Sequence, residues 1–174
     1  GAWDWLIAER MQAYTDMHVW EGELNHAVHF DAADVGEKDL GTLVENDHIQ
    51  WALWQELRAQ QKVGLMEGVL IQSIDTVTRE IILEDGRQIC ADLIVGADGA
   101  RSMVRESAGI EWIEKPYQQF VMVGNVRTEQ SHQNTCWQRY NDDNPFAFLP
   151  LADGSSSIAW YMPVEQKEWA NDLS

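Results

Sequence analysis

The chain has 174 residues, about one domain's length, and 45% of them are hydrophobic, enough to bury a core. Its formal net charge of −17 argues against duplex nucleic acid or an anionic membrane surface as a partner, because both attract positive charge. Cys90 and Cys136 lie far apart without metal-ligand spacing, so a reduced, cytoplasmic setting is the simplest interpretation. The sequence has no apolar run of about 18 residues and therefore predicts no membrane span.

The first third of the chain predicts two helices and three strands. The predicted elements are a helix over 3–11, strands over 18–20, 27–30 and 42–46, and a helix over 46–60. In the second helix the apolar residues recur on one face, which is typical of an amphipathic helix. Asp47 and Gln50 fit a capping-box pattern at its start.

The middle of the chain predicts strands over 63–68, 69–75 and 80–90, with a hairpin turn at Asp85-Gly86. The segment ADLIVGAD, 91–98, is a continuous apolar run of the kind that is buried on both faces of a sheet. A helix of two to three turns follows over 100–109, with Gly109 placed as its C-terminal cap.

The last third of the chain is mainly β. After a boundary near Lys115-Pro116, strands are predicted over 118–128, 135–142, 146–151 and 155–164, with a turn at 152–155 between the last two. Asp142 and Asp143 are expected in a solvated turn. The chain is thus mixed α/β to about residue 112 and mainly antiparallel β beyond.

The junction of the buried strand and the short helix, GADGARS, is the main candidate for a ligand site. It would place Asp98 at the carboxyl edge of a strand, where open α/β sheets bind ligands. Gly96 and Gly99 would let a ligand approach the backbone, and the helix N-terminus with Arg101 could hold a phosphate. The same residues allow a second interpretation, in which Asp98 only caps the helix.

Residues 96–105, GADGARSMVR, resemble the second flavin/NADPH motif, G-A-D-G-x-x-S-x-V-R, of the FAD-dependent aromatic hydroxylases typified by p-hydroxybenzoate hydroxylase. Every fixed position of the motif is matched. Three further segments, 19–34, 40–57 and 146–161, resemble the UbiH/UbiF/VisC group of ubiquinone-biosynthesis hydroxylases, most closely its UbiF-type members. The resemblance covers nearly the whole chain.

The resemblance implies an α/β fold, α+β in isolation, with part of a Rossmann-like FAD-binding domain and a mainly antiparallel β-sheet substrate domain. Residues 1–40 would be partial substrate-domain strands with a connecting helix, 41–114 part of the FAD-binding domain, and 115–174 the substrate-domain sheet. The family's other two flavin motifs, G-x-G-x-x-G and G-D-A-A-H, do not occur in this sequence. We therefore expect the chain to be the middle of a longer enzyme that binds FAD weakly without the remaining segments.

The resemblance also assigns cofactor contacts. Asp98 would contact both FAD and NADPH, and Gly99 would let the cofactor approach the backbone. Arg101 and Ser102 would face the cofactor from the helix N-terminus. Asn46 would reach the ribityl–phosphate region of the flavin, or alternatively cap its helix.

No catalytic side chain is expected, because in this class the flavin C4a-hydroperoxide carries the oxygen chemistry. NADPH reduces the flavin, O₂ adds, and one oxygen atom passes to a prenylated benzoquinol or phenol of ubiquinone biosynthesis. Phe148, Pro150 and Trp160 are candidates for an apolar substrate wall, or they simply pack the sheet. Arg105 is expected to be a structural salt-bridge partner.

Other hypotheses stay open at the level of the sequence. The parent enzyme could associate peripherally with a membrane or a biosynthetic complex, or form a homo-oligomer. A metal site is not expected, because His26 and His29 would point to opposite faces of a strand. The alternatives are another flavin enzyme with the same motif, such as a reductase or halogenase, and a non-catalytic α/β binding module in which Asp98 caps a helix.

Overall fold

The computed structural model describes residues 1–23, 26–141 and 144–172. The chain forms two compact units: unit 1 comprises Gly1–Gln61 and Pro116–Ser174, and unit 2 comprises Lys62–Lys115. The assignment of segments to flavin-binding and substrate domains stays a prediction. The turn expected at Asp142 and Asp143 lies outside the described residues.

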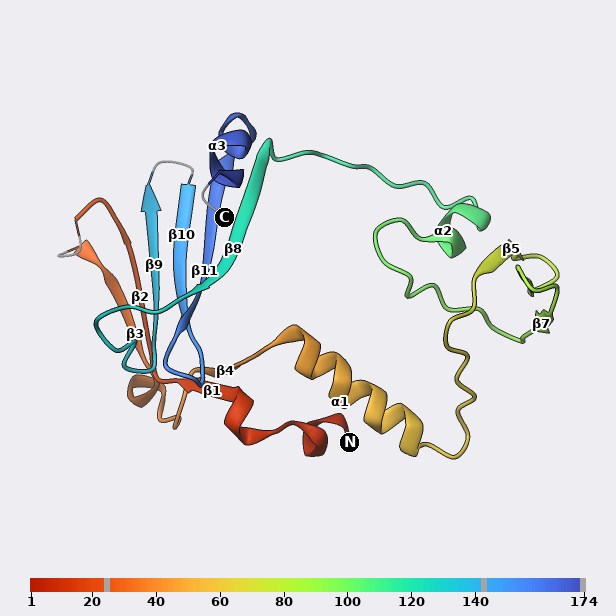
Figure 1. The fold of residues 1–174 in the computed structure, drawn as a ribbon, viewed down its shortest axis with the longest axis horizontal. Coiled ribbons are helices and arrows are strands. Elements are labelled where there is room, and N and C mark those ends of the chain that lie inside the picture. Colours follow the sequence, from red (N-terminus) through yellow and green to blue (C-terminus); the bar gives the residue numbers. More distant parts are fainter. Residues whose placement is uncertain (24–25, 142–143, 173–174) are drawn as a thin grey trace. The chain divides into compact units, whose positions relative to one another are not determined.

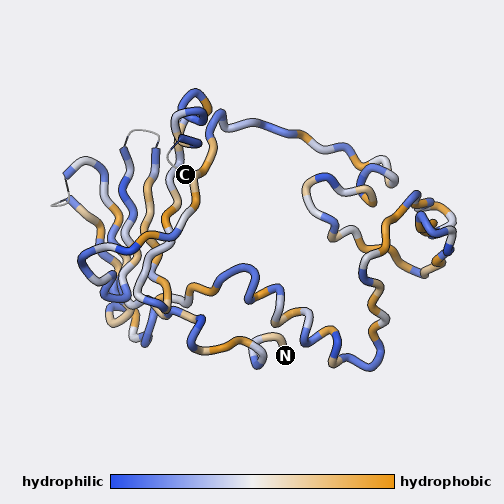
Figure 2. The backbone as a smooth tube through the Cα atoms, viewed as in Figure 1, coloured by the Kyte–Doolittle hydropathy of each residue, from blue (hydrophilic) through white to orange (hydrophobic). Residues whose placement is uncertain are grey.

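A six-stranded sheet dominates unit 1 (Figure 1), with the strand order β3-β2-β9-β10-β11-β8. Its strands are β2 (Asp16–Glu21), β3 (Val28–Asp31), β8 (Gln119–Val126), β9 (Thr135–Asn141), β10 (Asn144–Pro150) and β11 (Ser156–Pro163). All neighbouring pairs are antiparallel except β2 with β9, which run parallel. In Figure 2 hydrophobic residues lie within these strands, whereas the joining loops are mostly hydrophilic.

The prediction of four strands after residue 116 is therefore confirmed, including the turn between the last two. In that turn Gly154 N–H donates to the carbonyl of Leu151 at 3.1 Å. The N-terminal strands β2 and β3 complete the same sheet, so segments more than a hundred residues apart share one ladder. The resulting face is continuous across all six strands.

The remaining elements of unit 1 are shorter. They are β1 (Met11–Tyr14) paired antiparallel with β4 (Gly41–Val44), α1 (Asn46–Ala59), α3 (Lys167–Asn171), and the 3₁₀ turns η1 (Ala2–Trp5), η2 (Ala8–Arg10), η4 (Ala32–Val35) and η5 (Val164–Gln166). The predicted helix over 3–11 is wrong, because pairing with β4 draws Met11 into a strand and leaves two separate 3₁₀ turns before it. The predicted capping box is also wrong: Glu45 occupies the N-cap position without a capping side-chain bond, and its carboxylate pairs with Arg10 instead.

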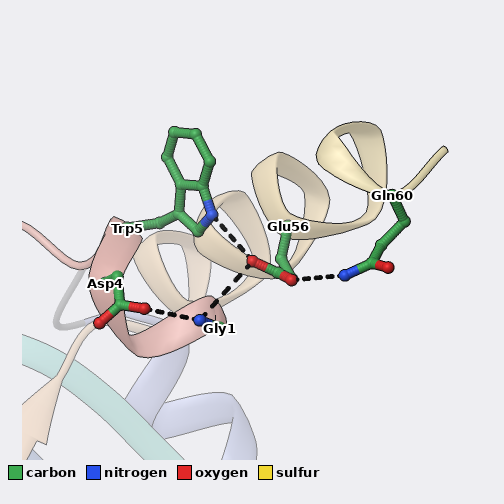
Figure 3. A network of polar contacts seen from close by, with 5 residues as sticks. All are labelled: Gly1, Asp4, Trp5, Glu56 and Gln60. Carbon is green, nitrogen blue, oxygen red and sulfur yellow. Dashed lines mark hydrogen bonds and ion pairs between the residues drawn. The ribbon is translucent and has the colours of Figure 1, made fainter.

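The N-terminal segment is fastened to α1 by polar contacts (Figure 3). The Trp5 indole N–H donates to Glu56 Oε2 at 3.1 Å, while at the end of α1 itself the Gln60 amide donates to Glu56 Oε1 at 2.6 Å and holds that carboxylate in place. Next to this network, Ile7 N–H donates to Nε2 of His48, a side chain that is only 2% exposed. The buried histidine is therefore used to satisfy a backbone donor.

Unit 2 contains a three-stranded antiparallel sheet, β5-β6-β7, and one short helix. The elements are β5 (Ile71–Asp75), β6 (Glu80–Leu83), β7 (Gln88–Cys90) and α2 (Met103–Ser107). The predicted hairpin is confirmed, with Gly86 N–H donating to Leu83 O at 2.9 Å in the turn. At the end of α2, Gly109 N–H bonds Glu106 O and Ile110 N–H bonds Arg105 O, the paired bonds of a Schellman motif, as expected from Gly109.

Two predicted strands of unit 2 do not form. Residues 63–68 have no strand structure, and neither does the apolar segment 91–98. Leu93 is 76% exposed and Val95 is 74% exposed, although the prediction buried both faces of this segment. A buried parallel strand requires neighbours on both sides, and none of the described residues pairs with this segment.

Candidate functional site

The Asp98 carboxylate is held by the start of α2. Ser102 Oγ donates to Asp98 Oδ1 at 2.5 Å, and Met103 N–H donates to Asp98 Oδ2 at 2.7 Å. Ser102 is also the N-cap residue of α2, and its Oγ accepts the N–H of Arg105 at 3.0 Å. The carboxylate and the hydroxyl therefore share the capping of this helix.

These bonds favour the ionised carboxylate. The hydroxyl of Ser102, followed by the backbone N–H groups of Asp98, Met103 and Val104, holds the pKa of Asp98 below its ordinary value of 3.8. The side chain is exposed, so it still presents acceptor positions to solvent. Asp98 can thus accept a hydrogen bond from a hydroxyl group at any pH where the chain is folded and the carboxyl ionised.

The N-terminus of α2 is not free to bind an anion. Its first N–H donors are taken by the side chains of Asp98 and Ser102. The expectation that these N–H groups bind a phosphate is therefore wrong, because the chain's own carboxylate occupies them. Arg101 makes no hydrogen bond or ion pair with any described residue, so its guanidinium remains the candidate partner for a phosphate.

The structure requires the two glycines of the motif for different reasons. A Cβ on Gly96 would lie 2.9 Å from Val104 Cβ, so Gly96 permits the close approach of the turn to α2. Gly99 has a φ of +82°, and a Cβ there would meet no atom within 4 Å. The space beside Gly99 is therefore open for a ligand to approach the backbone, next to the exposed side chains of Asp98 and Arg101.

Arg105 has a packing role rather than the expected salt bridge. Its guanidinium donates to the carbonyl of Ala100 at 2.8 Å and lies 4.7 Å from the centre of the Trp112 ring. No carboxylate pairs with it in the described part of the chain. Arg105 thus closes the loop that carries the motif.

A hollow of about 410 Å³ lies between α2 and the extended segment before it. Leu93, Ile94, Val104, Ala108 and Ile110 give it apolar walls. Asp98, Gly99 and Arg101 do not line this hollow. Ser102, which is buried, does line it, together with the charged residues Arg79, Asp92 and Arg105. Of the predicted cofactor residues on the motif loop, Asp98, Gly99 and Arg101 are therefore exposed to solvent, whereas Ser102 lies at the edge of the hollow.

The fifth predicted cofactor residue, Asn46, belongs to unit 1. It is the first residue of α1 and is exposed. The N-cap position is Glu45, so the capping alternative for Asn46 is not what the structure shows. Its contact with the flavin stays a prediction, as do the cofactor contacts of Asp98, Gly99, Arg101 and Ser102.

The three predicted substrate residues share one face of the six-stranded sheet, because Pro150 pairs with Ser156 and Phe146 pairs with Trp160. Pro150 is fully buried and packs the sheet, which was the alternative interpretation of this residue. Trp160 packs edge-on against Phe146, with ring centres 5.5 Å apart. Phe148 lines a hollow of about 420 Å³ on this face. The substrate contacts of these residues stay predictions.

The same face carries an aromatic stack that the sequence did not reveal. His29 on β3, His18 on β2 and Trp137 on β9 lie in one row, with ring centres 4.2 Å and 4.5 Å apart. His29 Nε2 also lies 2.8 Å from Asp16 Oδ1. Burial, and next the neighbouring His29, lower the pKa of His18 below 6.5. Only the register of three strands brings these residues together, so no local sequence signal could have found them.

Two negative findings concern the described residues only. They contain no group of three or more His, Cys, Asp or Glu side chains arranged to hold a metal ion. None of their helices combines the length and hydropathy needed to cross a membrane.

The fold and the motif loop together define a class of protein. The chain combines an Asp-Gly turn that presents an exposed carboxylate and an open glycine with a large, mostly antiparallel sheet. The sequence model of the family described as "FAD binding domain" matches residues 48–173. The chain belongs to this family.

Curated relatives support the resemblance to ubiquinone-biosynthesis hydroxylases. The chain is 42% identical over 164 residues to 3-demethoxyubiquinol 3-hydroxylase of Escherichia coli (strain K12), covering 92% of this chain and 41% of that protein. It is 33% identical over 172 residues to the mitochondrial ubiquinone biosynthesis monooxygenase COQ6 of Mus musculus, covering 92% of this chain and 36% of that protein. The chain thus spans well under half the length of these relatives.

Solved structures show the same fold at low sequence identity. PqsL, a probable FAD-dependent monooxygenase from Pseudomonas aeruginosa, superposes with a TM-score of 0.77 at 18% identity, over 91% of this chain and 45% of that chain. Klebsiella pneumoniae HpxO, complexed with FAD and uric acid, gives a TM-score of 0.67 at 14% identity, over 90% of this chain and 42% of that chain. The predicted fold class, that of p-hydroxybenzoate hydroxylase-like flavin monooxygenases, is therefore confirmed.

Proposed function

We propose that this chain is part of an FAD- and NADPH-dependent monooxygenase that hydroxylates a prenylated benzoquinol in ubiquinone biosynthesis. The observation that carries the proposal is the match to the FAD-binding family together with an Asp-Gly turn whose carboxylate and glycine face open space. The 42% identity to a demethoxyubiquinol hydroxylase supports the substrate class. We further propose that the full-length enzyme is cytoplasmic and that it associates with the membrane that contains its prenylated substrate.

The residues present fit part of an FAD site. Asp98 is an ionised acceptor for ribose hydroxyl donors, Gly99 leaves room for close approach, and Arg101 is free to pair with a phosphate. The helix N-terminus does not fit a phosphate, because Asp98 and Ser102 already accept its N–H groups. Arg101 is therefore the residue of this loop that would hold the phosphate.

When bound, the flavin supplies the oxygen-activating chemistry, with NADPH as reductant and O₂ as oxygen source. The chain's own residues provide binding and orientation. Ser102 fixes the Asp98 carboxylate at 2.5 Å, so the acceptor is pre-oriented before the cofactor arrives. The apolar sheet face that carries Phe148 would exclude water from the ring of the substrate.

Flavin binding by the loop is tested first. FAD is titrated into the chain and flavin fluorescence is recorded; we expect no submicromolar quenching, because the loop supplies only part of the contacts. In the whole enzyme, Asp98→Asn should weaken FAD binding, whereas Asp92→Asn, an exposed carboxylate just before the motif, should not. Tight binding by the chain alone, or equal effects of the two variants, would contradict the assigned contacts.

Activity is tested on the whole enzyme. NADPH oxidation and the mass of the product are measured with a demethoxyubiquinol analogue and with quinols that lack the methoxy or methyl group. A product heavier by one oxygen atom supports the proposed function. NADPH oxidation without a hydroxylated product across the whole quinol series would refute it.

A further inference from the structure

The aromatic stack on the six-stranded sheet ends beside a hollow. His29, His18 and Trp137 stack with interplanar angles of 12° and 11°, one ring on each of three neighbouring strands. The next strand places Phe148 opposite Trp137 in the register. Among the described residues, however, the Phe148 ring does not stack on Trp137 and packs edge-on against Phe146, with ring centres 4.9 Å apart.

The hollow lies where a further ring would continue the stack beyond Trp137. Trp20, Trp137 and Phe148 are its aromatic walls, and its rim is formed by Thr128, Gln130, Ser131, His132 and Gln133. Its volume of about 420 Å³ is within the range of small-molecule pockets. A planar ring placed there would continue the stack that Trp137 ends, and stacked aromatic pairs are stabilised beyond their buried area.

A serine hydroxyl lies at the base of the hollow. Ser156 is 3% exposed, lines the hollow, and pairs with Pro150 so that its side chain is on the same face as Phe148. Its Oγ makes no hydrogen bond with any described residue and is not fully enclosed by protein atoms. An accessible hydroxyl without a partner in the described part of the chain can donate to, or accept from, a ligand oxygen at this point.

The lining of the hollow carries no charge. None of its residues is Asp, Glu, Lys or Arg. The His132 ring accepts Asn134 N–H through Nδ1 at 3.1 Å and lies 3.2 Å from Leu151 O through Nε2, so both ring nitrogens have partners within the chain. Arg139 is on the same sheet face two residues beyond Trp137 but does not line the hollow. An anionic ligand would therefore be desolvated there without a cation in contact with it.

We infer that the hollow bounded by Trp20, Trp137, Phe148 and Ser156 binds a neutral, oxygenated aromatic ring, with the ring stacked on Trp137 and one ring oxygen bonded to Ser156. This inference rests on the proposed function for the identity of the ligand, an uncharged quinol ring. It also assigns a selectivity: the site accepts uncharged phenols and disfavours benzoates of the same size.

The probes are 2-methoxyphenol, which is neutral at pH 7, and 4-hydroxybenzoate, which is an anion. Each is titrated into the ¹⁵N-labelled chain, and the indole N–H signals of the nine tryptophans are followed by NMR. The signals of Trp20 and Trp137 are assigned by Trp→Phe substitution. We expect 2-methoxyphenol to shift these two signals, with an affinity at least about tenfold higher than that of 4-hydroxybenzoate, because the hollow offers no contacting charge.

Ser156→Ala tests the hydrogen bond, and Ser157→Ala is the matched control, since Ser157 points to the opposite face of the same strand. We expect Ser156→Ala to weaken binding of 2-methoxyphenol about three- to tenfold and Ser157→Ala to leave it unchanged. Equal binding by both variants, shifts confined to other tryptophans, absence of binding, or equal affinity for the benzoate would each overturn the inference. Turnover is not measured here, so failure of this site leaves the proposed function to its own test.

Discussion

The shared cap of α2 gives the most direct test of how the motif loop is held. Replacing Ser102 with alanine removes the Oγ that accepts Arg105 N–H at 3.0 Å and donates to Asp98 at 2.5 Å. Ser102 is 8% exposed, so water cannot fully replace the lost acceptor. Loss of an N-cap serine costs about 1 kcal/mol, with a range of about 0.5–2. We expect unit 2 to lose about 1–2 kcal/mol of stability, because the cap and the carboxylate contact are lost together.

Native-state hydrogen exchange measures this loss where it occurs. A free-energy change of about 1–2 kcal/mol corresponds to about 5–30-fold faster exchange at the amide of Arg105. The amide of Met103 should also exchange faster, since Ser102 no longer positions the Asp98 carboxylate that accepts it. Ser107→Ala is the matched control, because it removes an exposed serine hydroxyl from the same helix.

Ser102→Thr should restore most of the protection, because threonine also caps helices through its hydroxyl. The reasoning fails if Ser102→Ala and Ser107→Ala give the same exchange rates at Arg105. It also fails if the Thr variant is no better protected than the Ala variant. In either case the capping bonds would contribute nothing to the stability of the loop.

Three further predictions address the glycines, the histidine stack and the N-terminal segment. Gly96→Ala should lower the free energy of unfolding in urea by about 1–3 kcal/mol, because its Cβ would lie 2.9 Å from Val104 Cβ. Gly99→Ala should lower it by only about 1 kcal/mol, because its φ of +82° is strained for alanine. A larger loss for Gly99→Ala than for Gly96→Ala would contradict these causes. Because burial lowers the pKa of His18 below 6.5 in the folded chain, the unfolded chain takes up the proton first, so stability should fall as the pH drops below about 6.5. His18→Phe should flatten this stretch of the stability curve, and an unchanged slope would exclude His18 as its cause. Trp5→Phe removes the indole donor to α1 and should raise amide exchange in 2–5 while leaving unit 2 unchanged; exchange equal to that of the parent chain would show that this bond is not stabilising.

Local chemistry made several elements predictable. The helix over 46–59 carries an apolar stripe, and the hairpin at Asp85-Gly86 carries its own turn residues. The segment 91–98 has an equally strong pattern but forms no strand, because a strand is stable only with ladder partners and none of the described residues pairs with it. The hydrophobic pattern of the sequence therefore predicted strand character, but it could not show whether another strand would pair with this segment.

The two candidate sites differ in the same way. The motif loop is local: Asp98, Gly99 and Ser102 lie within five residues, so the sequence could identify them and pose the choice between capping and cofactor contact. The structure shows that Asp98 caps α2 and still presents an exposed, ionised carboxylate, so the two interpretations are compatible. The aromatic hollow is non-local, because Trp20 and Trp137 meet only through the parallel pairing of β2 with β9. That pairing leaves no periodic pattern in the sequence of either segment, so a hollow of this kind has to be located from the register of the strands.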